Sequence, residues 1–224
     1  MKVLVIGTDI TIFKKDSEAR SRIESYGRLF DELHIIIYTP QGFKAEILPS
    51  GVRLWPTNSF WFFFRPFDAV SIGKRIIRER GIDVISVQDP AESGLAGWLL
   101  KRKTGLPLHI QVHADFFSPY FRKNSWKEFL RYWLTRFTIR HADTLRLVSE
   151  RIKQSIAASR RLPSTTAILP IFVDCERIEM AKPAINLHQK YPQFDFIILI
   201  VARLFREKNI GLALEAFREL LKEF

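Results

Sequence analysis

The sequence predicts an α/β fold, a doubly wound parallel sheet of the Rossmann-like type with helices on both faces. Short apolar runs typical of buried strands alternate along the chain with longer segments whose apolar residues recur at helical spacing. Strands and helices that alternate in this way form parallel sheets joined by right-handed crossovers. Helix-boundary signals agree with this interpretation, because the segment 66–80 begins at Pro66 and is followed by Gly81, as helix capping favours.

The elements of this sheet can be placed in order along the first 180 residues. The run KVLVIG at 2–7 is the first strand, and LHIIIY at 33–38 is a second strand, closed by Pro40 and Gly42. Further strands are expected at 52–55, 83–87, 108–112, 144–148 and 166–169. Helices are expected at 17–30, 66–80, 92–103, 126–141 and 150–158. Together they predict one domain over 1–180, with its binding crevice at the carboxyl ends of the strands.

The end of the chain predicts the start of a second domain. Residues 181–193 hold two prolines and few periodic apolar residues, so we expect an interdomain connector there. Residues 194–224 would then supply one strand at 197–202 and one helix that begins near Asn209.

Three cations lie between this last strand and helix: Arg203, Arg206 and Lys208. A strand that leads into a helix through a basic loop with free backbone N–H groups forms a natural anion site. A solvated turn is the plainer interpretation of the same residues, and spacing alone favours it.

Composition limits the function classes. A hydrophobic content of 47% is sufficient for a sizeable core, and the single Cys175 excludes an internal disulfide and fits a reducing, cytoplasmic setting. No signal peptide and no apolar run of membrane-spanning length is visible. The formal net charge of +11 is concentrated in 122–161, where eleven Lys and Arg residues face three acids. Such a patch attracts nucleic acid, anionic lipid or phosphorylated substrates, and charge alone does not choose among them.

Two strand ends carry candidate site residues. Asp89 and Glu92 follow the strand 83–87, although carboxylates at a helix start need no further function. His113 follows the strand 108–112, and Asp115, two residues later, is placed to orient it. A buried structural histidine is an equally good interpretation of that spacing.

The helix expected at 17–30 carries Arg20 and Arg22 beside Ser17. These cations are placed to face an anionic acceptor, and a solvated helix face is the simpler alternative.

An aromatic and basic helix is expected at 126–141. Its apolar residues recur at helical spacing: Trp126, Phe129, Leu130, Trp133, Leu134 and Phe137. A stripe of cations four residues apart lies beside them: Lys123, Lys127 and Arg131. This arrangement suits the surface of an anionic membrane, whereas core packing of the aromatic face is the alternative. A second aromatic run, SFWFFFRPF at 59–67, fits a buried loop, a membrane contact or an acceptor contact.

Several segments together resemble the retaining glycosyltransferases of family four, which have two Rossmann-like domains. The segments are QDPAESGLAG, LHIQVHADFFSPYF, HADTLRLVSERIK and AILPIFVD, followed by Arg203 and Lys208. The resemblance implies that 1–180 is the acceptor-binding domain and that 194–224 begins the donor-binding domain. It also implies a nucleotide-sugar donor, a lipid-linked or polysaccharide acceptor, and a hexosyltransferase without a metal or other cofactor.

The same resemblance assigns roles to residues. His113 matches the histidine near the transferring sugar, with Asp89, Glu92, Asp115, Arg20 and Arg22 on the acceptor side. Arg203 and Lys208 match the pair that holds the donor diphosphate, where fixed cations stabilise the charge of the leaving group in place of a metal. Since many relatives glycosylate lipid-linked acceptors, the resemblance favours peripheral attachment at the inner face of the plasma membrane through Lys123, Lys127, Arg131, Trp126 and Trp133.

Two departures from the family pattern affect these expectations. The loop after the first strand, TDITIF at 8–13, lacks the glycine pair that approaches the donor phosphates in many members. The paired-glutamate element that contacts the donor sugar is absent from these 224 residues. We therefore expect a truncated second domain and little or no activity from this chain by itself.

Two other function classes compete with this interpretation. A nucleic-acid-binding module would use aromatics stacked among cations, but no nucleic-acid motif supports it, so we expect no nucleic-acid partner. A non-catalytic membrane-surface module would keep the enzyme fold for binding alone.

Overall fold

An eight-stranded sheet organises the first 172 residues, in the strand order β3-β4-β2-β1-β5-β6-β7-β8. The strands are β1 (Lys2–Gly7), β2 (Glu32–Ile37), β3 (Glu46–Ile47), β4 (Arg53–Pro56), β5 (Val84–Val87), β6 (Leu108–Val112), β7 (Thr144–Leu147) and β8 (Thr165–Ile168). All neighbours are parallel except the short edge pair β3–β4. The computed structural model describes residues 1–159, 162–173, 175–202, 204 and 208–222.

The order of the strands confirms the doubly wound sheet. From β1 the chain builds outward through β2 to β4, and then returns to place β5 on the other side of β1. From β5 it continues in the opposite direction through β6 and β7 to β8. The direction reverses between β1 and β5, and ligands of such sheets bind beside this switch point, at the carboxyl ends of the strands.

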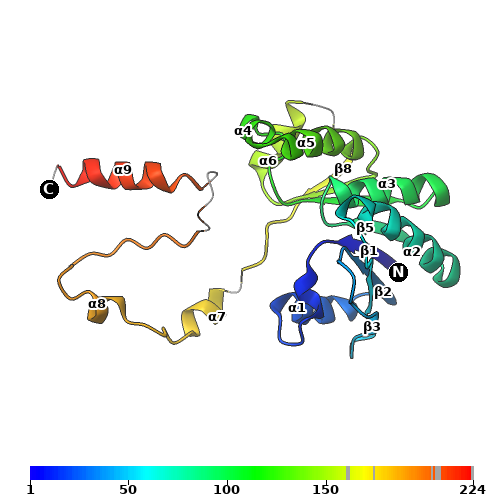
Figure 1. Cartoon of the computed structure of the whole chain (residues 1–224), viewed down its shortest axis with the longest axis horizontal. Coiled ribbons are helices and arrows are strands. Elements are labelled where there is room, and N and C mark those ends of the chain that lie inside the picture. The colour runs from blue at the N-terminus through cyan, green and yellow to red at the C-terminus, as the bar shows by residue number, and fades with distance from the viewer. Residues whose placement is uncertain (160–161, 174, 203, 205–207, 223–224) are drawn as a thin grey trace. The chain divides into compact units, whose positions relative to one another are not determined.

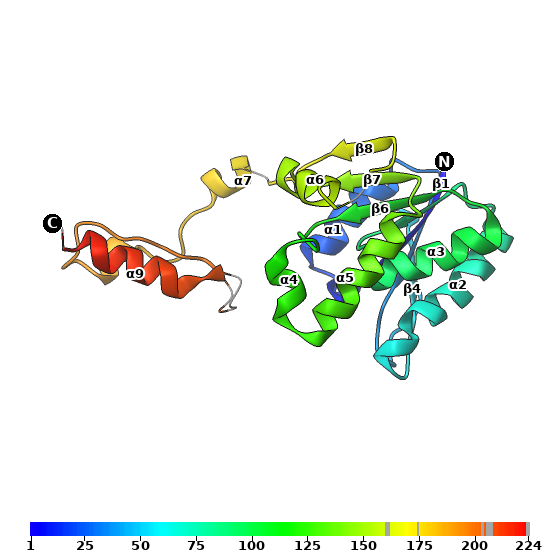
Figure 2. The same cartoon turned by 90° about the horizontal axis from the view of Figure 1, so that it is seen from above.

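Helices cover both faces of the sheet (Figures 1 and 2). On one face α2 (Arg65–Arg80) packs against α3 (Glu92–Thr104), and α3 packs against α5 (Trp126–Ile139). Their buried residues join those of α6 (Glu150–Ala157) in the larger core, which includes Leu4, Ile76, Leu100 and Ile139. The other face is covered by the short 3-10 helix η1 (Ile10–Phe13) and by α1 (Glu18–Gly27), over a smaller core that includes Ile23 and Ile35.

The helix boundaries on the first face follow the capping signals. Pro66 lies in the first turn of α2, and Gly81 ends that helix in the left-handed conformation (φ 65°), where a side chain would be strained. Within α3, Gly97 allows the helix to approach the sheet closely, because a Cβ there would lie 2.7 Å from both Leu108 and Val87. The first-domain elements expected from sequence are therefore present within a few residues of their predicted bounds.

Several short elements were not expected from the sequence. They are β3, η1, the 3-10 turn η2 (Phe62–Phe64) and α4 (Pro119–Asn124). All four are connections at the ends of longer elements, where two to six residues carry too little periodicity for recognition.

The second unit, Val173–Phe224, contains α7 (Cys175–Met180), α8 (Leu187–Lys190) and α9 (Ile210–Leu220) in its described part. The first unit ends at Phe172, whereas the sequence predicted a first domain that extends to residue 180. The helix expected near Asn209 is present as α9, but residues 197–202 do not form the strand that we predicted. A strand requires a hydrogen-bonded neighbour, and apolar character alone does not supply one.

Candidate functional site

The candidate site lies at the carboxyl ends of β5 and β6, beside the switch point. Gln88 and Asp89 follow β5, and His113 follows β6. A small recess of about 30 Å³ is lined by Gly7, Asp9, Arg22 and Gln88, with apolar residues behind them. At this volume the recess has room for little more than a water molecule, so larger ligands must lie outside it.

His113 is solvent-exposed at the mouth of the site. Crowding by neighbouring protein atoms lowers the pKa of its imidazole, and the cations Arg146 and Arg22 lower this pKa further. The ring is therefore neutral at pH 7 and offers one N–H donor and one acceptor nitrogen to a ligand. Arg22 comes from α1 and Arg146 from β7, so cations on two other elements act on this imidazole.

Asp115 is directed toward α6. Its carboxylate accepts a hydrogen bond from Ser155 Oγ at 2.7 Å and lies 3.9 Å from Arg151 Nη1. Since Asp115 follows His113 closely in sequence, we expected it to orient the imidazole, but in the structure its carboxylate binds side chains of α6.

Asp89 is enclosed behind the first turn of α3. Its Oδ1 accepts the backbone N–H of Ala91 at 2.9 Å, whereas Oδ2 is buried, as is the hydroxyl of Ser93 that interacts with this carboxylate. Burial raises the pKa of Asp89, and nearby Glu92 acts in the same direction, while Ser93 and Arg131 oppose them. Because Oδ2 is enclosed by protein, Asp89 bears on the site through the backbone of the first turn of α3 that it holds.

Glu92 forms an ion pair with Arg131, whose Nε lies 3.1 Å from its carboxylate. Its backbone carbonyl accepts the hydroxyl of Tyr38 at 3.0 Å. Glu92, which we expected to bind the acceptor, therefore pairs with Arg131, which we expected on a membrane surface. This pair joins α3 to α5.

The two arginines of α1 differ in their surroundings. Arg20 is buried and forms a two-pronged pair with Glu46, with Nη–Oε distances of 2.5 and 3.1 Å, and a third contact to Glu24. It does not present its guanidinium to an acceptor as expected, because β3 supplies the carboxylate that neutralises it. Arg22 is exposed and lines the recess.

Of the pair expected to hold the donor diphosphate, Arg203 and Lys208, the structure describes Lys208. Arg203 and Arg206 lie outside the described residues, whereas Lys208 directly precedes Asn209 and the first turn of α9.

The expected membrane residues occupy α5 and its approach. Trp126, Trp133, Lys123 and Lys127 are exposed, whereas Arg131 is turned toward Glu92. Across the described ranges, no helix is long and apolar enough to span a bilayer. No group of three or more His, Cys, Asp or Glu side chains suited to a metal ion occurs in the same ranges.

Sequence reasoning missed two polar residues near His113, Gln111 of β6 and Arg146 of β7. Arg146 donates from Nη1 to Gln111 Oε1 at 2.9 Å and also contacts the carbonyls of Leu169 and Pro170. A charged residue in the middle of an otherwise apolar strand was the available signal.

Comparison with known proteins identifies the first unit. Residues 19–171 match the family model described as a glycosyl transferase 4-like domain. No curated protein matches the chain significantly.

Solved structures share its fold at low sequence identity. A sucrose-phosphate synthase chain from Thermosynechococcus elongatus is 14% identical (TM-score 0.51), over 86% of this chain and 98% of that chain. The lipopolysaccharide outer core galactosyltransferase WaaB is 16% identical (TM-score 0.51), over 77% of this chain and 46% of its own. A UDP-GlcNAc 2-epimerase from Neisseria meningitidis bound to UDP-GlcNAc is 14% identical (TM-score 0.51), over 75% of this chain and 45% of its own. The chain thus spans less than half of the galactosyltransferase and of the epimerase.

Proposed function

This chain belongs to the glycosyl transferase 4-like domain family, and from that premise we propose that it forms the acceptor-binding half of a retaining glycosyltransferase. The enzyme would transfer a hexose from a nucleotide-sugar to a lipid-linked or polysaccharide acceptor. The observation that carries the proposal is the position of His113, a neutral imidazole at the carboxyl edge beside the switch point, whose pKa Arg22 and Arg146 both lower.

The residues around this point have distinct proposed roles. His113 hydrogen-bonds the transferring sugar, and Asp89, enclosed behind the first turn of α3, shapes the acceptor side. Arg22 supplies positive charge for an anionic part of a substrate. Arg203 and Lys208 hold the donor diphosphate, in agreement with the family pattern of the sequence. Fixed cations at that position stabilise the charge of the leaving diphosphate without a metal ion.

The fold neighbours support a nucleotide-sugar as the donor. One of them is a galactosyltransferase and another is an epimerase bound to UDP-GlcNAc. Their likeness to this chain is one of fold.

The decisive experiment compares His113→Ala and His113→Gln in the natural full-length protein. Loss of a ground-state and transition-state contact to the sugar should lower kcat/KM by at least roughly a hundredfold for Ala, with partial rescue by Gln. His188→Ala, at an exposed position in the second unit, is the matched control. Unchanged transfer by His113→Ala would rule out the proposed role. We also propose that the 224-residue chain alone transfers no sugar, and measurable turnover by it would contradict this.

A non-catalytic membrane-surface module is the second candidate, because the exposed aromatics of α5 do not depend on catalysis. Peripheral attachment at the inner face of the plasma membrane belongs to both candidates.

A further inference from the structure

The buried face of α5 is not its aromatic face. Thr135, Thr138 and Ile139 are fully buried. Thr138 donates its hydroxyl to the carbonyl of Pro90, and its side chain lies against Gly94 of α3, where a Cβ would lie 3.1 Å away. These buried residues anchor the helix, together with Leu134 on the core and Phe137 against Trp98. The large side chains of Trp126, Phe129, Leu130 and Trp133 are left for another contact.

The aromatic face of α5 is open to solvent. Trp126 is 62% exposed, Trp133 is 50% exposed, and Phe129 and Leu130 are also exposed. Their spacing places them on one side of the helix. Contiguous apolar surface of this kind marks an interaction site in a folded protein.

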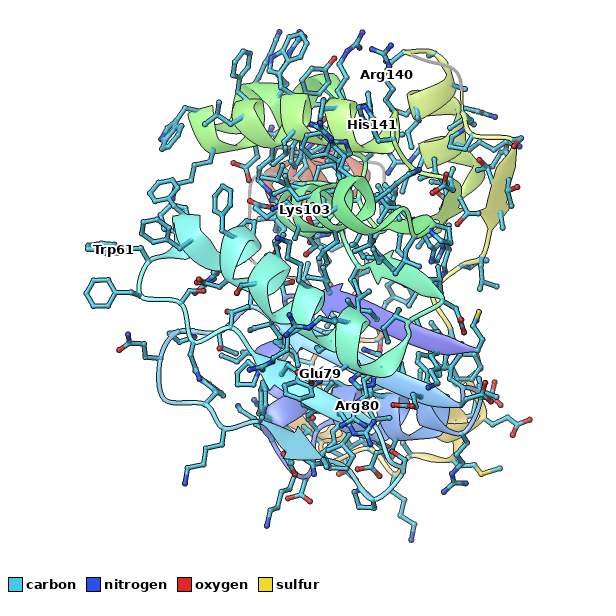
Figure 3. The ribbon with its side chains drawn as sticks, turned by 90° about the vertical axis from the view of Figure 1, so that its right-hand side faces the viewer. Trp61, Glu79, Arg80, Lys103, Arg140 and His141 are labelled. Atoms are coloured by element: carbon cyan, nitrogen blue, oxygen red, sulfur yellow. The ribbon has the colours of Figure 1, made fainter. Side chains whose placement is uncertain are left out.

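The second aromatic segment is also exposed. All five residues from Phe60 to Phe64 are at least 50% exposed, and Phe67 is 56% exposed. Trp61 projects outward beyond the start of α2 (Figure 3). The buried-loop interpretation of 59–67 is therefore wrong for these six rings, because the turn η2 holds them outside the core.

One contact joins the two segments. The Lys127 ammonium lies 5.7 Å from the centre of the Phe62 ring, so α5 and η2 meet at a cation–π contact. We call the combined set the aromatic surface; it consists of Phe60, Trp61, Phe62, Phe63, Phe64, Phe67, Trp126, Phe129, Leu130 and Trp133.

Charge selects the occupant of the aromatic surface. Residues 119–139 carry five Lys and Arg residues and the single acid Glu128. Arg136 lies over Trp133, and Lys123 is exposed in the approach to α5. A second copy of this chain would bring the same cations face to face, whereas an anionic bilayer receives both the aromatic rings and the cations.

The aromatic surface is connected to the candidate site. Arg131 follows Lys127 by one helical turn and binds Glu92 at the start of α3. Glu92 follows β5 three residues after Asp89, so this ion pair ties α5 to the segment that carries the candidate site.

We propose that the aromatic surface docks the protein on an anionic bilayer, and that the acceptor is consequently lipid-linked and enters the site along α5. The first part stands independently, and the second part rests on the proposed function.

Vesicle sedimentation tests the docking with the whole chain. We expect binding to vesicles of phosphatidylcholine and phosphatidylglycerol in equal parts, and little binding to phosphatidylcholine alone. The variant Phe62→Ser/Phe63→Ser should lower partitioning at least roughly tenfold, since two aromatic rings lose their apolar environment. Tyr26→Ser/Leu29→Ser removes exposed apolar side chains outside the surface and should leave partitioning unchanged. Equal losses in both variants, or binding to single-stranded DNA in place of vesicles, would overturn the docking proposal.

Tryptophan quenching locates the contact. Brominated lipid should quench Trp61, Trp126 and Trp133, while the variant in which these three are Phe keeps Trp55 and Trp98 and should lose the quenching. Quenching that persists in this variant would place the membrane contact elsewhere.

The acceptor class is tested in the full-length enzyme. Phe62→Ser/Phe63→Ser should lower kcat/KM for a lipid-linked acceptor in anionic vesicles about tenfold, and leave it unchanged for a short water-soluble acceptor. Equal losses for both acceptors would overturn the lipid-linked assignment. Vesicle binding without transfer to either acceptor would instead refute the proposed function and retain the docking surface.

Discussion

Arg131 places its Nε 3.1 Å from each carboxylate oxygen of Glu92, and so joins the aromatic helix α5 to the first turn of α3. The guanidinium also lies over the ring of Phe116 at 5.5 Å. A residue of the docking helix is thereby held at the carboxyl edge of the sheet, where the candidate site lies.

The Arg131–Glu92 pair should contribute modestly to stability, because both side chains are partly exposed. A double-mutant cycle with Arg131→Gln and Glu92→Gln should give a coupling free energy of about 0.3–1 kcal/mol in urea unfolding. A coupling energy near zero would show that the two helices are held by packing alone.

Thr138 and Thr135 offer a matched comparison of two fully buried hydroxyls. Thr138 donates to Pro90, whereas the Thr135 hydroxyl oxygen has no partner among the described residues. Thr138→Val should lower the free energy of unfolding by about 1–3 kcal/mol, and Thr135→Val should be neutral or stabilising. Equal effects in urea unfolding would contradict the assigned hydrogen bond.

Gly97 and Gly94 differ in the space around them. A Cβ at Gly97 would lie 2.7 Å from two core side chains, while one at Gly94 would lie 3.1 Å from Thr138. Gly97→Ala should therefore cost about 1–3 kcal/mol, more than Gly94→Ala, and the order of the two Tm values checks this. The opposite order would mean that α3 shifts away from the sheet at little cost.

Stability should fall on acidification. His34 is fully buried, with Nε2 at 3.1 Å from Glu32 and Nδ1 accepting from Trp55, and burial lowers its pKa below 6.5. The unfolded chain then binds the proton more readily, so the free energy of unfolding decreases as the pH falls below 6.5. Hydrogen bonds from Lys2 and His34 lower the pKa of Glu32 from 4.5 to about 2, which adds a loss of stability between those pH values.

Urea unfolding at several pH values between 7 and 5 measures this effect. His34→Gln removes one titrating group and should make the dependence on pH shallower. If the pH dependence of the variant is as steep as that of the original protein, the effect belongs to His109 and His113, whose pKa values desolvation and nearby Arg146 also lower.

The sequence predicted the sheet well, because its strands are long apolar runs with clear boundaries. The pattern could not predict which face of α5 is buried, since Trp and Phe usually mark the core side of a helix. Here the hydroxyl of Thr138 and the absence of a side chain at Gly94 allow the close contact instead.

The site was predicted less completely than the fold. The position of His113 follows from β6, but partners distant in sequence decide what a charge does. Glu46 neutralises Arg20, Ser155 binds Asp115, and Glu92 captures Arg131. The segment 197–202 has the composition of a strand, and its lack of pairing was not visible in the sequence.

The two outer strands of the sheet have different consequences for how the protein should be handled. At one end the antiparallel β3 is tied to α1 by Arg20 and Glu46. At the other end the four residues of β8 pair with β7 and with no further strand in the described part of the chain, and Ile168 is exposed. Backbone groups along an open strand recruit strands from other molecules. Concentrated samples should therefore associate in pairs through β8, and a charged substitution on this strand, such as Ile168→Lys, should oppose this better than a charged tag at Met1.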